Sequence, residues 1–342
     1  MARPTVYDIA ATAGVSVATV DRVLNRRPGV RAHTIERVEA AIAKLNYVRD
    51  IAATNLAKQR TYSLTFIVPE GPNAFMRQLE SEIRQAMDRS RVERTEINLV
   101  TVPAFNSAAL TKALDEIDIT RVCGAAFVAI GSPDVHAAVD RLKKAGLHLV
   151  TLVSDLSASK RDHYAGIDNV AAGRTAASLL GRFLRGKAGK VAVVAGSMIV
   201  RDHVERKLGF DQVMRSEFSN LDVLPPLEGL DNGGIVEVIL RKCLEEHPEI
   251  IGIYSLGAGN RGVIAALKAL NIAGKLRVIA HEVTKHAREA LVDGTFDAVL
   301  NQNSGHEVRS AIRVLKACAD GQKPVEAQER IRIDVFLRDN LL

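Results

Sequence analysis

A chain of 342 residues with 47% hydrophobic and 25% charged residues has the composition of a folded globular protein, which excludes the disordered and fibrous classes and allows two or three domains. Its net charge of +6 is concentrated at the start, because residues 1–60 hold ten Lys or Arg against five Asp or Glu and so carry +5, which leaves +1 for the rest. Such a basic segment is typical of one that contacts phosphates, although a solvated positive surface would give the same count.

The cysteines and the apolar runs indicate the compartment. Cys123, Cys243 and Cys318 are odd in number and widely spaced, without a metal-ligand pattern, so we expect reduced core residues. The start of the chain lacks the apolar run of a secretory signal, and no later run approaches membrane-spanning length. We therefore expect a cytoplasmic protein with no membrane partner, no metal and no cofactor.

Residues 5–25 read as two short helices joined by a tight turn. Thr5 is placed to cap the first helix, with Asp8 answering it three residues later, and Gly14 supplies the backbone conformation that ends it. Ser16 then caps the second helix. Helical spacing places one apolar face toward a core and leaves a small polar face exposed, which consists of Val17, Ala18, Asp21 and Arg22.

A third helix follows the turn at residues 26–29. Ile35, Val38, Ile42 and Leu45 form its apolar stripe, so residues 1–47 predict a minimal three-helix domain. On the pattern alone, a helix-turn-helix and a small helical cap on a larger domain are equally good interpretations. Residues 48–61 are too polar and too few to hold a helix in isolation and predict a linker.

The first fifty residues resemble the opening of the LacI/GalR family of bacterial transcription regulators. The resemblance lies in Thr5 to Ala10, Ala13 to Ser16, Thr19-Val20 and Arg22 to Asn25, and it continues without a gap through Leu45-Asn46-Tyr47. It implies that the first two helices form a DNA-binding helix-turn-helix and that residues 48–61 form a hinge helix that pushes a leucine into the minor groove. The implied DNA-binding residues are Thr5, Tyr7, Ser16, Val17, Ala18, Thr19, Asp21, Arg22, Asn25, Ala53 and Leu56.

Two positions depart from that family's pattern. Asp21 stands in place of a usual serine on the helix that reads the bases, so it places a carboxylate near phosphates or near a cytosine amino group. Arg49-Asp50 replaces the Pro-Asn pair with which many members enter the hinge. An operator sequence borrowed from relatives is therefore unsafe for this chain.

From residue 62 onward, apolar strand-like runs alternate with amphipathic helices. Such alternation predicts parallel sheets covered by helices, and the number of units favours two lobes. The predicted helices include 75–89, 171–184 and 262–270. The predicted strands are 63–68, 97–102, 125–130, 147–153, 191–195, 250–255, 277–280 and 297–300, with a last one near 331–335.

Residues 62–342 resemble the two-lobed periplasmic sugar-binding proteins of the ribose type. The resemblance implies one lobe of about 62–163 plus 294–320 and a second of 164–293 plus 321–342, with the ligand in the cleft between them. Ligands in open parallel sheets bind beyond the carboxyl ends of the strands, where several polar residues of this chain fall. The implied effector-binding residues are Asn73, Phe75, Met76, Asp155, Arg206, Asp231, Asn260, Glu282 and Gln302.

An enzyme hypothesis rests on Gly257-x-Gly259-x-x-Gly262. This motif follows a strand, opens a helix and has Glu282 twenty residues beyond it, as in dinucleotide sites of NAD(P)-dependent oxidoreductases. No convincing general acid or base accompanies it, so we expect a protein that is not an enzyme. His281 and His286 are five residues apart rather than four, which argues against a metalloprotease site.

The hypothesis that follows is a transcription regulator, most simply a repressor. It implies a homodimer on a pseudo-palindromic operator, controlled by a small sugar or polyol effector. Only seven residues follow the last predicted strand, too few for a tetramerising heptad helix, so a dimer is the expected limit.

Overall fold

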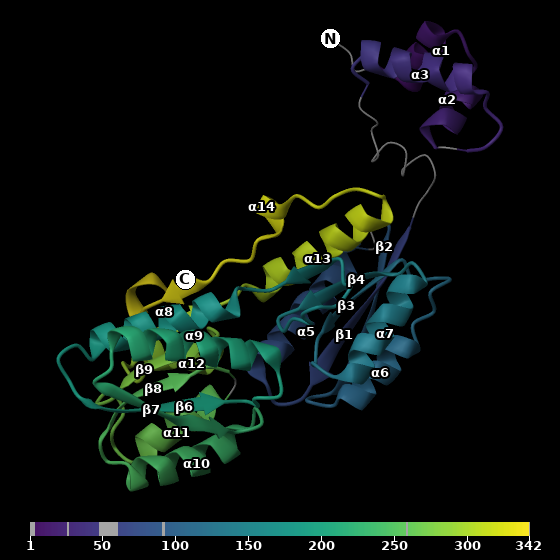
Figure 1. The fold of residues 1–342 in the computed structure, drawn as a ribbon. Coiled ribbons are helices and arrows are strands. Elements are labelled where there is room, and N and C mark those ends of the chain that lie inside the picture. The colour runs from purple at the N-terminus through teal and green to yellow at the C-terminus, as the bar shows by residue number, and fades with distance from the viewer. Residues whose placement is uncertain (1–3, 26, 48–60, 91–92, 258, 342) are drawn as a thin grey trace. The chain divides into compact units, whose positions relative to one another are not determined.

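The computed structural model describes residues 4–25, 27–47, 61–90, 93–257 and 259–341. The chain divides into two units, Met1–Arg60 and Thr61–Leu342, which are described separately (Figure 1). The predicted hinge positions Ala53 and Leu56 lie outside the described residues. In the part of the chain that is described, no helix has the length and hydrophobicity needed to cross a membrane.

The first unit is a bundle of α1 (Val6–Ala13), α2 (Val17–Leu24) and α3 (Ala32–Lys44). Thr5 and Asp8 form the predicted capping box, in which the Asp8 carboxylate accepts the Thr5 backbone N–H at 2.7 Å. Gly14 ends α1 at φ 62°, a conformation that favours glycine. The three helices share a core made by Ile9, Ala10, Ala13, Val20, Val38 and Ala41.

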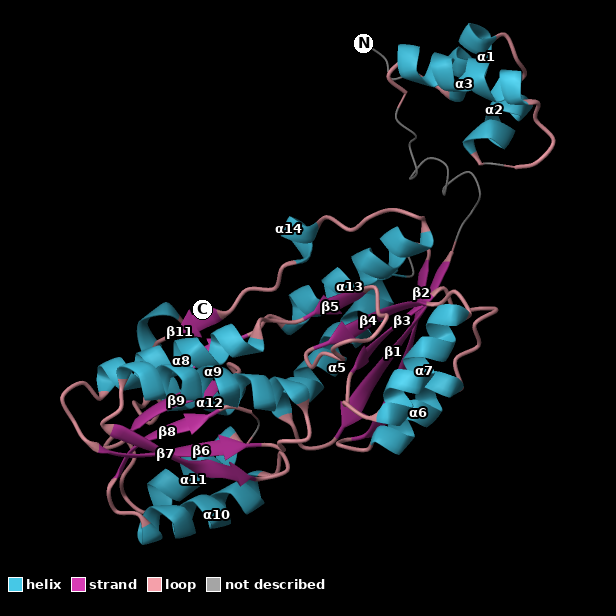
Figure 2. Cartoon of the chain, in the orientation of Figure 1, coloured by secondary structure: helices cyan, strands magenta, loops and turns pink. Residues whose placement is uncertain are grey.

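A five-stranded parallel sheet forms the first lobe of the second unit, in the order β2-β1-β3-β4-β5. The strands are β1 (Tyr62–Glu70), β2 (Thr95–Pro103), β3 (Gly124–Val128), β4 (His148–Leu152) and β5 (His163–Ala165). Both faces are apolar because helices cover both: α5 (Ala74–Ser90) and α13 (Ser304–Ala319) pack on one core, α6 (Ser107–Asp115) and α7 (Pro133–Lys144) on the other (Figure 2).

The second lobe is a six-stranded sheet in the order β11-β10-β9-β8-β6-β7, parallel except for β11. One face is covered by α8 (Asn169–Phe183) and α9 (Arg201–Glu217), the other by α10 (Gly233–Glu246), α11 (Asn260–Ala269) and α12 (Lys285–Val292). The strands are β6 (Gly189–Ala195), β7 (Leu221–Glu228), β8 (Ile250–Ser255), β9 (Arg277–His281), β10 (Ala298–Asn301) and β11 (Asp334–Phe336); α14 (Glu326–Glu329) and a 3₁₀ turn (Arg338–Asn340) complete the chain.

Two glycines let α8 and α9 pack at backbone distance. A Cβ on Gly173 would lie 1.9 Å from the Arg206 carbonyl oxygen, and one on Gly209 would lie 2.0 Å from the Val170 carbonyl oxygen. No larger residue fits at either position without separating the helices. This close packing fixes the position of α9, which carries Arg206 toward the space between the lobes.

The mixed α/β class and the two sheets confirm the predicted fold, but the lobe assignment needs one correction. Residues 294–320 were expected in the first lobe, whereas β10 pairs with β9 and so belongs to the second sheet. Only α13 from that segment packs on the first lobe, where Val308 and Val314 enter its core. Alternating apolar residues identify a strand but do not identify its partner, which explains the error.

Two strands were not anticipated, and a third differs in position. β5 has three residues, and β7 is a half-exposed edge strand containing Pro225 and Pro226, so neither has a strong strand pattern. The last strand begins at Asp334, three residues later than the predicted range, and runs antiparallel to β10.

Candidate functional site

A cavity of about 690 Å³ lies between the two lobes, at the carboxyl ends of their strands. Eight of the nine predicted cleft residues line it: Asn73, Phe75, Met76, Arg206, Asp231, Asn260, Glu282 and Gln302. Asp155, the ninth, is turned away, because its carboxylate accepts both Nε and Nη2 of Arg161 at 2.5 Å and the Thr151 hydroxyl at 2.8 Å. Asp155 therefore supports the loop after β4 and does not face the cavity.

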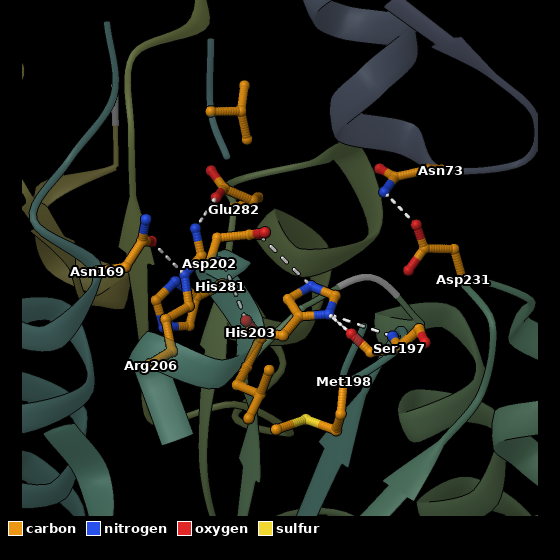
Figure 3. A network of polar contacts seen from close by, with 12 residues as sticks. Asn73, Asn169, Ser197, Met198, Asp202, His203, Arg206, Asp231, His281 and Glu282 are labelled. Atoms are coloured by element: carbon orange, nitrogen blue, oxygen red, sulfur yellow. Dashed lines mark hydrogen bonds and ion pairs between the residues drawn. The ribbon is translucent and has the colours of Figure 1, made fainter. Parts of the chain in front are cut away.

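Arg206 is the buried cation of the site, with 2% of its surface exposed. Its Nε donates to the Asn169 side-chain oxygen at 2.8 Å, and its Nη1 donates to the Leu256 carbonyl at 2.9 Å (Figure 3). Its Nη2 lies 3.7 Å from Glu282 Oε1 and has no hydrogen-bond partner among the described residues. Two fixed nitrogens therefore aim a third donor that is available to a ligand.

Glu282 follows β9 in a left-handed backbone conformation, with φ 67°. Its Oε1 accepts the Gln302 side-chain amide at 2.8 Å, and its Oε2 accepts the Gln302 backbone N–H at 3.3 Å. Burial raises the pKa of Glu282 to about 7, although the Arg206 guanidinium and the Gln302 hydrogen bonds oppose this shift. This carboxyl group therefore changes its charge near neutral pH.

Asn260 lines the cavity, but its side chain is already used within the protein. Its amide nitrogen donates to the His281 carbonyl at 2.8 Å, and its oxygen accepts the Ser255 hydroxyl at 2.8 Å. These bonds tie the start of α11 to the ends of β8 and β9. Asn260 is placed to hold neighbouring groups in position, rather than to offer a free amide.

Asn73 and Asp231 join the two lobes directly. The Asn73 amide donates to Asp231 Oδ2 at 2.7 Å, and Figure 3 shows the two side chains facing each other. The Asn73 oxygen meanwhile accepts the backbone N–H of Phe75 at 2.9 Å, which fixes its direction at the start of α5. Burial raises the pKa of Asp231, opposed by His203 and the Asn73 bond, and its Oδ1 has no partner within the described chain.

Four further buried polar residues line the cavity and were missed from the sequence: Ser154, Asp202, His203 and His281. Asp202 and His203 precede Arg206 by four and three residues on α9, a spacing that places them on its face and could have revealed them. His203 Nδ1 lies 2.8 Å from the Ser197 carbonyl oxygen, and its Nε2 lies 3.7 Å from Asp202. His281 Nε2 contacts the Tyr254 hydroxyl at 2.9 Å, and burial holds the pKa of His281 well below its usual value.

The glycines of the Gly257-x-Gly259-x-x-Gly262 motif allow neighbouring groups to pack closely against the backbone. A Cβ on Gly257 would lie 2.4 Å from His203 Nε2, and one on Gly262 would lie 2.1 Å from the Gly233 carbonyl oxygen. Gly259 has φ 120°, and its Cβ would meet Val236 at 2.7 Å. Glu282, which would have to hold a ribose, is bound to Gln302. The geometry therefore gives no support to the oxidoreductase hypothesis.

In the first unit, Ala18 and Arg22 are exposed on α2, and Tyr7 on α1 is 71% exposed. Val17, Thr19 and Asp21 are half-buried. The Asp21 carboxylate accepts the Asn25 amide at 2.7 Å and lies 3.4 Å from Arg27 Nη1. Asp21, which departs from the family pattern, is thus paired with neighbours in its own unit. Arg22 remains as the exposed cation of α2.

Several predicted DNA-binding residues of the first unit, the head, stabilise the ends of its helices. Ser16 accepts the Thr19 backbone N–H at 3.2 Å, and the hydroxyls of Ser16 and Thr19 lie 2.9 Å apart. Thr5 caps α1, and Asn25 bonds back to the Asp21 carbonyl at 2.8 Å, which closes α2. These four predicted DNA-binding residues therefore shape the head, whatever contacts they make with DNA.

Two family models match the chain. Residues 5–50 match the bacterial regulatory proteins of the lacI family, and residues 64–323 match the periplasmic binding protein domain. Catabolite control protein A of Staphylococcus xylosus is 41% identical over 75 residues, which is 22% of this chain and 23% of that protein. The chain thus spans about a quarter of the length of the curated relatives it matches.

Solved structures resemble the second unit. The glucose-galactose binding protein GanP of Geobacillus stearothermophilus superposes with a TM-score of 0.73 at 18% identity, over 82% of this chain and 99% of that one. A solute-binding protein of Burkholderia graminis in complex with D-arabinose gives a TM-score of 0.74 at 22% identity, over 82% and 96%. At these identities, the likeness establishes a shared two-lobed fold.

Proposed function

This chain belongs to the lacI family of bacterial regulatory proteins, and from that premise we propose that it is a transcription regulator whose operator affinity is set by a small sugar or polyol bound between its lobes. It acts in the cytoplasm by binding alone, without catalysis. It acts as a homodimer, so that each α2 enters a major groove of a pseudo-palindromic operator.

One observation carries the proposal: a lacI-type head and a two-lobed cavity with unsatisfied buried polar atoms occur in the same chain. Arg206 Nη2, Asp231 Oδ1 and Gln302 Oε1 are buried without partners in the described structure. Leaving such atoms unpaired is costly, whereas a hydroxyl can satisfy both donors and acceptors. A polyhydroxylated molecule therefore fits this set of groups better than an apolar one.

The cavity is shared by two lobes, which gives the effector a way to control the head. The Asn73–Asp231 hydrogen bond and the contact between Arg201 and Ser157 both cross from one lobe to the other. An effector that binds one arrangement of the lobes more tightly than another shifts the population toward it. We propose that this shift changes the geometry of the dimer and hence its operator affinity.

Replacing Arg22 with Ala is expected to weaken specific operator binding 10- to 100-fold, because each forked contact to a guanine contributes about 1–3 kcal/mol of discrimination. Binding to unrelated DNA is expected to change little. Fluorescence anisotropy with the chain's own promoter DNA and with a scrambled duplex measures both affinities. Arg121→Ala is the control, because Arg121 is an 85% exposed arginine of the other unit. Equal losses on both duplexes would show that Arg22 contacts phosphates only.

A further inference from the structure

The two halves of the cavity differ in chemistry. Among the described residues that line it from the first lobe, only Glu70, Asn73 and Ser154 have polar side chains. Asn73 is committed to Asp231, Glu70 is exposed, and Ser154 has a buried hydroxyl without a partner among the described residues. The remainder of this half is apolar, and its larger side chains are Phe75, Met76, Phe105, Leu110, Ile130 and Val153.

The polar half belongs to the second lobe. Arg206, Asp231 and Gln302 each keep a buried polar atom without a partner in the described chain, one of them a donor and two of them acceptors. All three lie in parts of the chain that follow β5 and belong to the second lobe. On the first-lobe side only the Ser154 hydroxyl is buried and unpartnered among the described lining residues, so a ligand that satisfies all four groups presents most of its hydroxyls to the second lobe.

Two residues of the apolar half are held in an unfavourable backbone conformation. Phe105 has φ 59°, and Val153 has φ 60°, a region that aromatic and β-branched residues rarely adopt. The strand-end loop is held there because the Val153 N–H donates to the Ala165 carbonyl at 3.1 Å and the Val153 carbonyl accepts the Tyr164 hydroxyl at 2.7 Å. Glycine or asparagine would fit both positions with less strain. Large apolar side chains at strained positions in a cavity wall indicate a function for those side chains.

The size of the cavity supports the same conclusion. A volume of about 690 Å³ falls within the roughly 300–1,000 Å³ of pockets that enclose drug-sized ligands. A free monosaccharide is smaller than such ligands, and its hydroxyls point in every direction around the ring. Apart from one that reaches Ser154, those on the far side would face the apolar half and lose their hydrogen bonds to water.

We propose that the effector is an amphipathic glycoside, a sugar or polyol unit that carries an apolar substituent. Its hydroxyls bind Arg206, Asp231 and Gln302, and its apolar substituent packs against Phe105, Ile130 and Val153 of the first lobe. This inference rests on the proposed function, because it takes the cavity to be the effector site.

Isothermal titration of the full chain with matched ligands tests the inference. The probes are free glucose, galactose, xylose and ribose, with the methyl and phenyl glycosides of each. For at least one sugar, we expect the phenyl glycoside to bind at least tenfold more tightly than the free sugar. If a free sugar binds as tightly as its glycosides or more tightly, the inference is wrong and the proposed function stands. If no probe of either kind binds, the assignment of the cavity to a sugar-like effector fails as well.

Variants at Phe105 locate the apolar subsite. Phe105→Asn suits the left-handed backbone, so it is expected to fold, and it should reduce the preference for the phenyl glycoside over the free sugar at least fivefold. Phe105→Leu should restore most of that preference. Leu208→Ala is the control, since Leu208 is a 51% exposed apolar residue that does not line the cavity. An unchanged preference in Phe105→Asn would overturn the proposed placement of the substituent.

Discussion

Replacing Arg206 with Met is expected to weaken effector binding roughly 100-fold, since hydrogen bonds to a buried charged group contribute about 1.5–3 kcal/mol each. Arg206 is 2% exposed, and Asn169 and Leu256 hold two of its nitrogens so that Nη2 remains for the ligand. Methionine has a similar length and fills the space without donating. The effector identified in the glycoside titrations provides the ligand, and isothermal titration provides the affinity.

Two further variants separate ligand binding from stability. Arg206→Met leaves the Leu256 carbonyl and the Asn169 oxygen without their donor, so its thermal midpoint is expected to fall as well. Arg206→Lys keeps the charge but loses the fork, and should show most of the loss in affinity with a smaller loss in stability. Arg261→Met is the control, because Arg261 is an exposed arginine that also lines the cavity. If Arg261→Met weakens binding as much as Arg206→Met, the ligand lies nearer the rim than we propose.

The head could be predicted from its sequence because its determinants are local. Thr5, Asp8 and Gly14 act on backbone groups a few residues away, so their spacing alone specifies where α1 begins and ends. The partner of a strand is not a local property. Residues 297–300 read as a strand, but only the folded sheet shows that this strand, β10, lies beside β9 in the second lobe.

The cavity was predictable to the level of position, because the carboxyl ends of parallel strands meet at one edge of a sheet. The direction of each side chain depends on neighbours that spacing does not reveal. Asp155 stands one residue beyond Ser154, which lines the cavity, yet Arg161 draws its carboxylate away. Asn260 reaches the cavity wall, but Ser255 and the His281 carbonyl use its amide. The polar atoms that remain available to a ligand can be identified only after such internal hydrogen bonds are assigned.

Raising the pH from 5 to 8 is expected to destabilise the effector-free protein by about 2.5 kcal/mol more than its Glu282→Gln variant. The pKa of Glu282 is about 7 in the folded protein against an ordinary value of 4.5. Between these values the folded chain keeps a proton that the unfolded chain has lost, so each pH unit costs about 1.4 kcal/mol. The stability that the protonated carboxyl contributes is complete below pH 4.5 and is lost as the pH rises through 7.

The wild type must be compared with Glu282→Gln because other buried groups also titrate in this pH range. Burial raises the pKa of Glu307 well above its usual value and lowers that of His281, and these groups give slopes of opposite sign in this range. Both residues are present in the wild type and in the variant, so most of their effect cancels in the difference. Denaturant titrations at pH 5, 6, 7 and 8 give the free energy of unfolding for each protein.

Glu116→Gln provides the matched control, because Glu116 is a 67% exposed glutamate that forms a surface ion pair with Lys112. Its pH profile should follow that of the wild type. The prediction is wrong if the free energy of unfolding of the wild type and that of Glu282→Gln change in parallel with pH. That result would mean that Arg206 and Gln302 keep Glu282 ionised throughout. In the expected case, a neutral Glu282 donates its proton and an ionised one accepts two hydroxyls, so effector affinity should also change as the pH passes through 7.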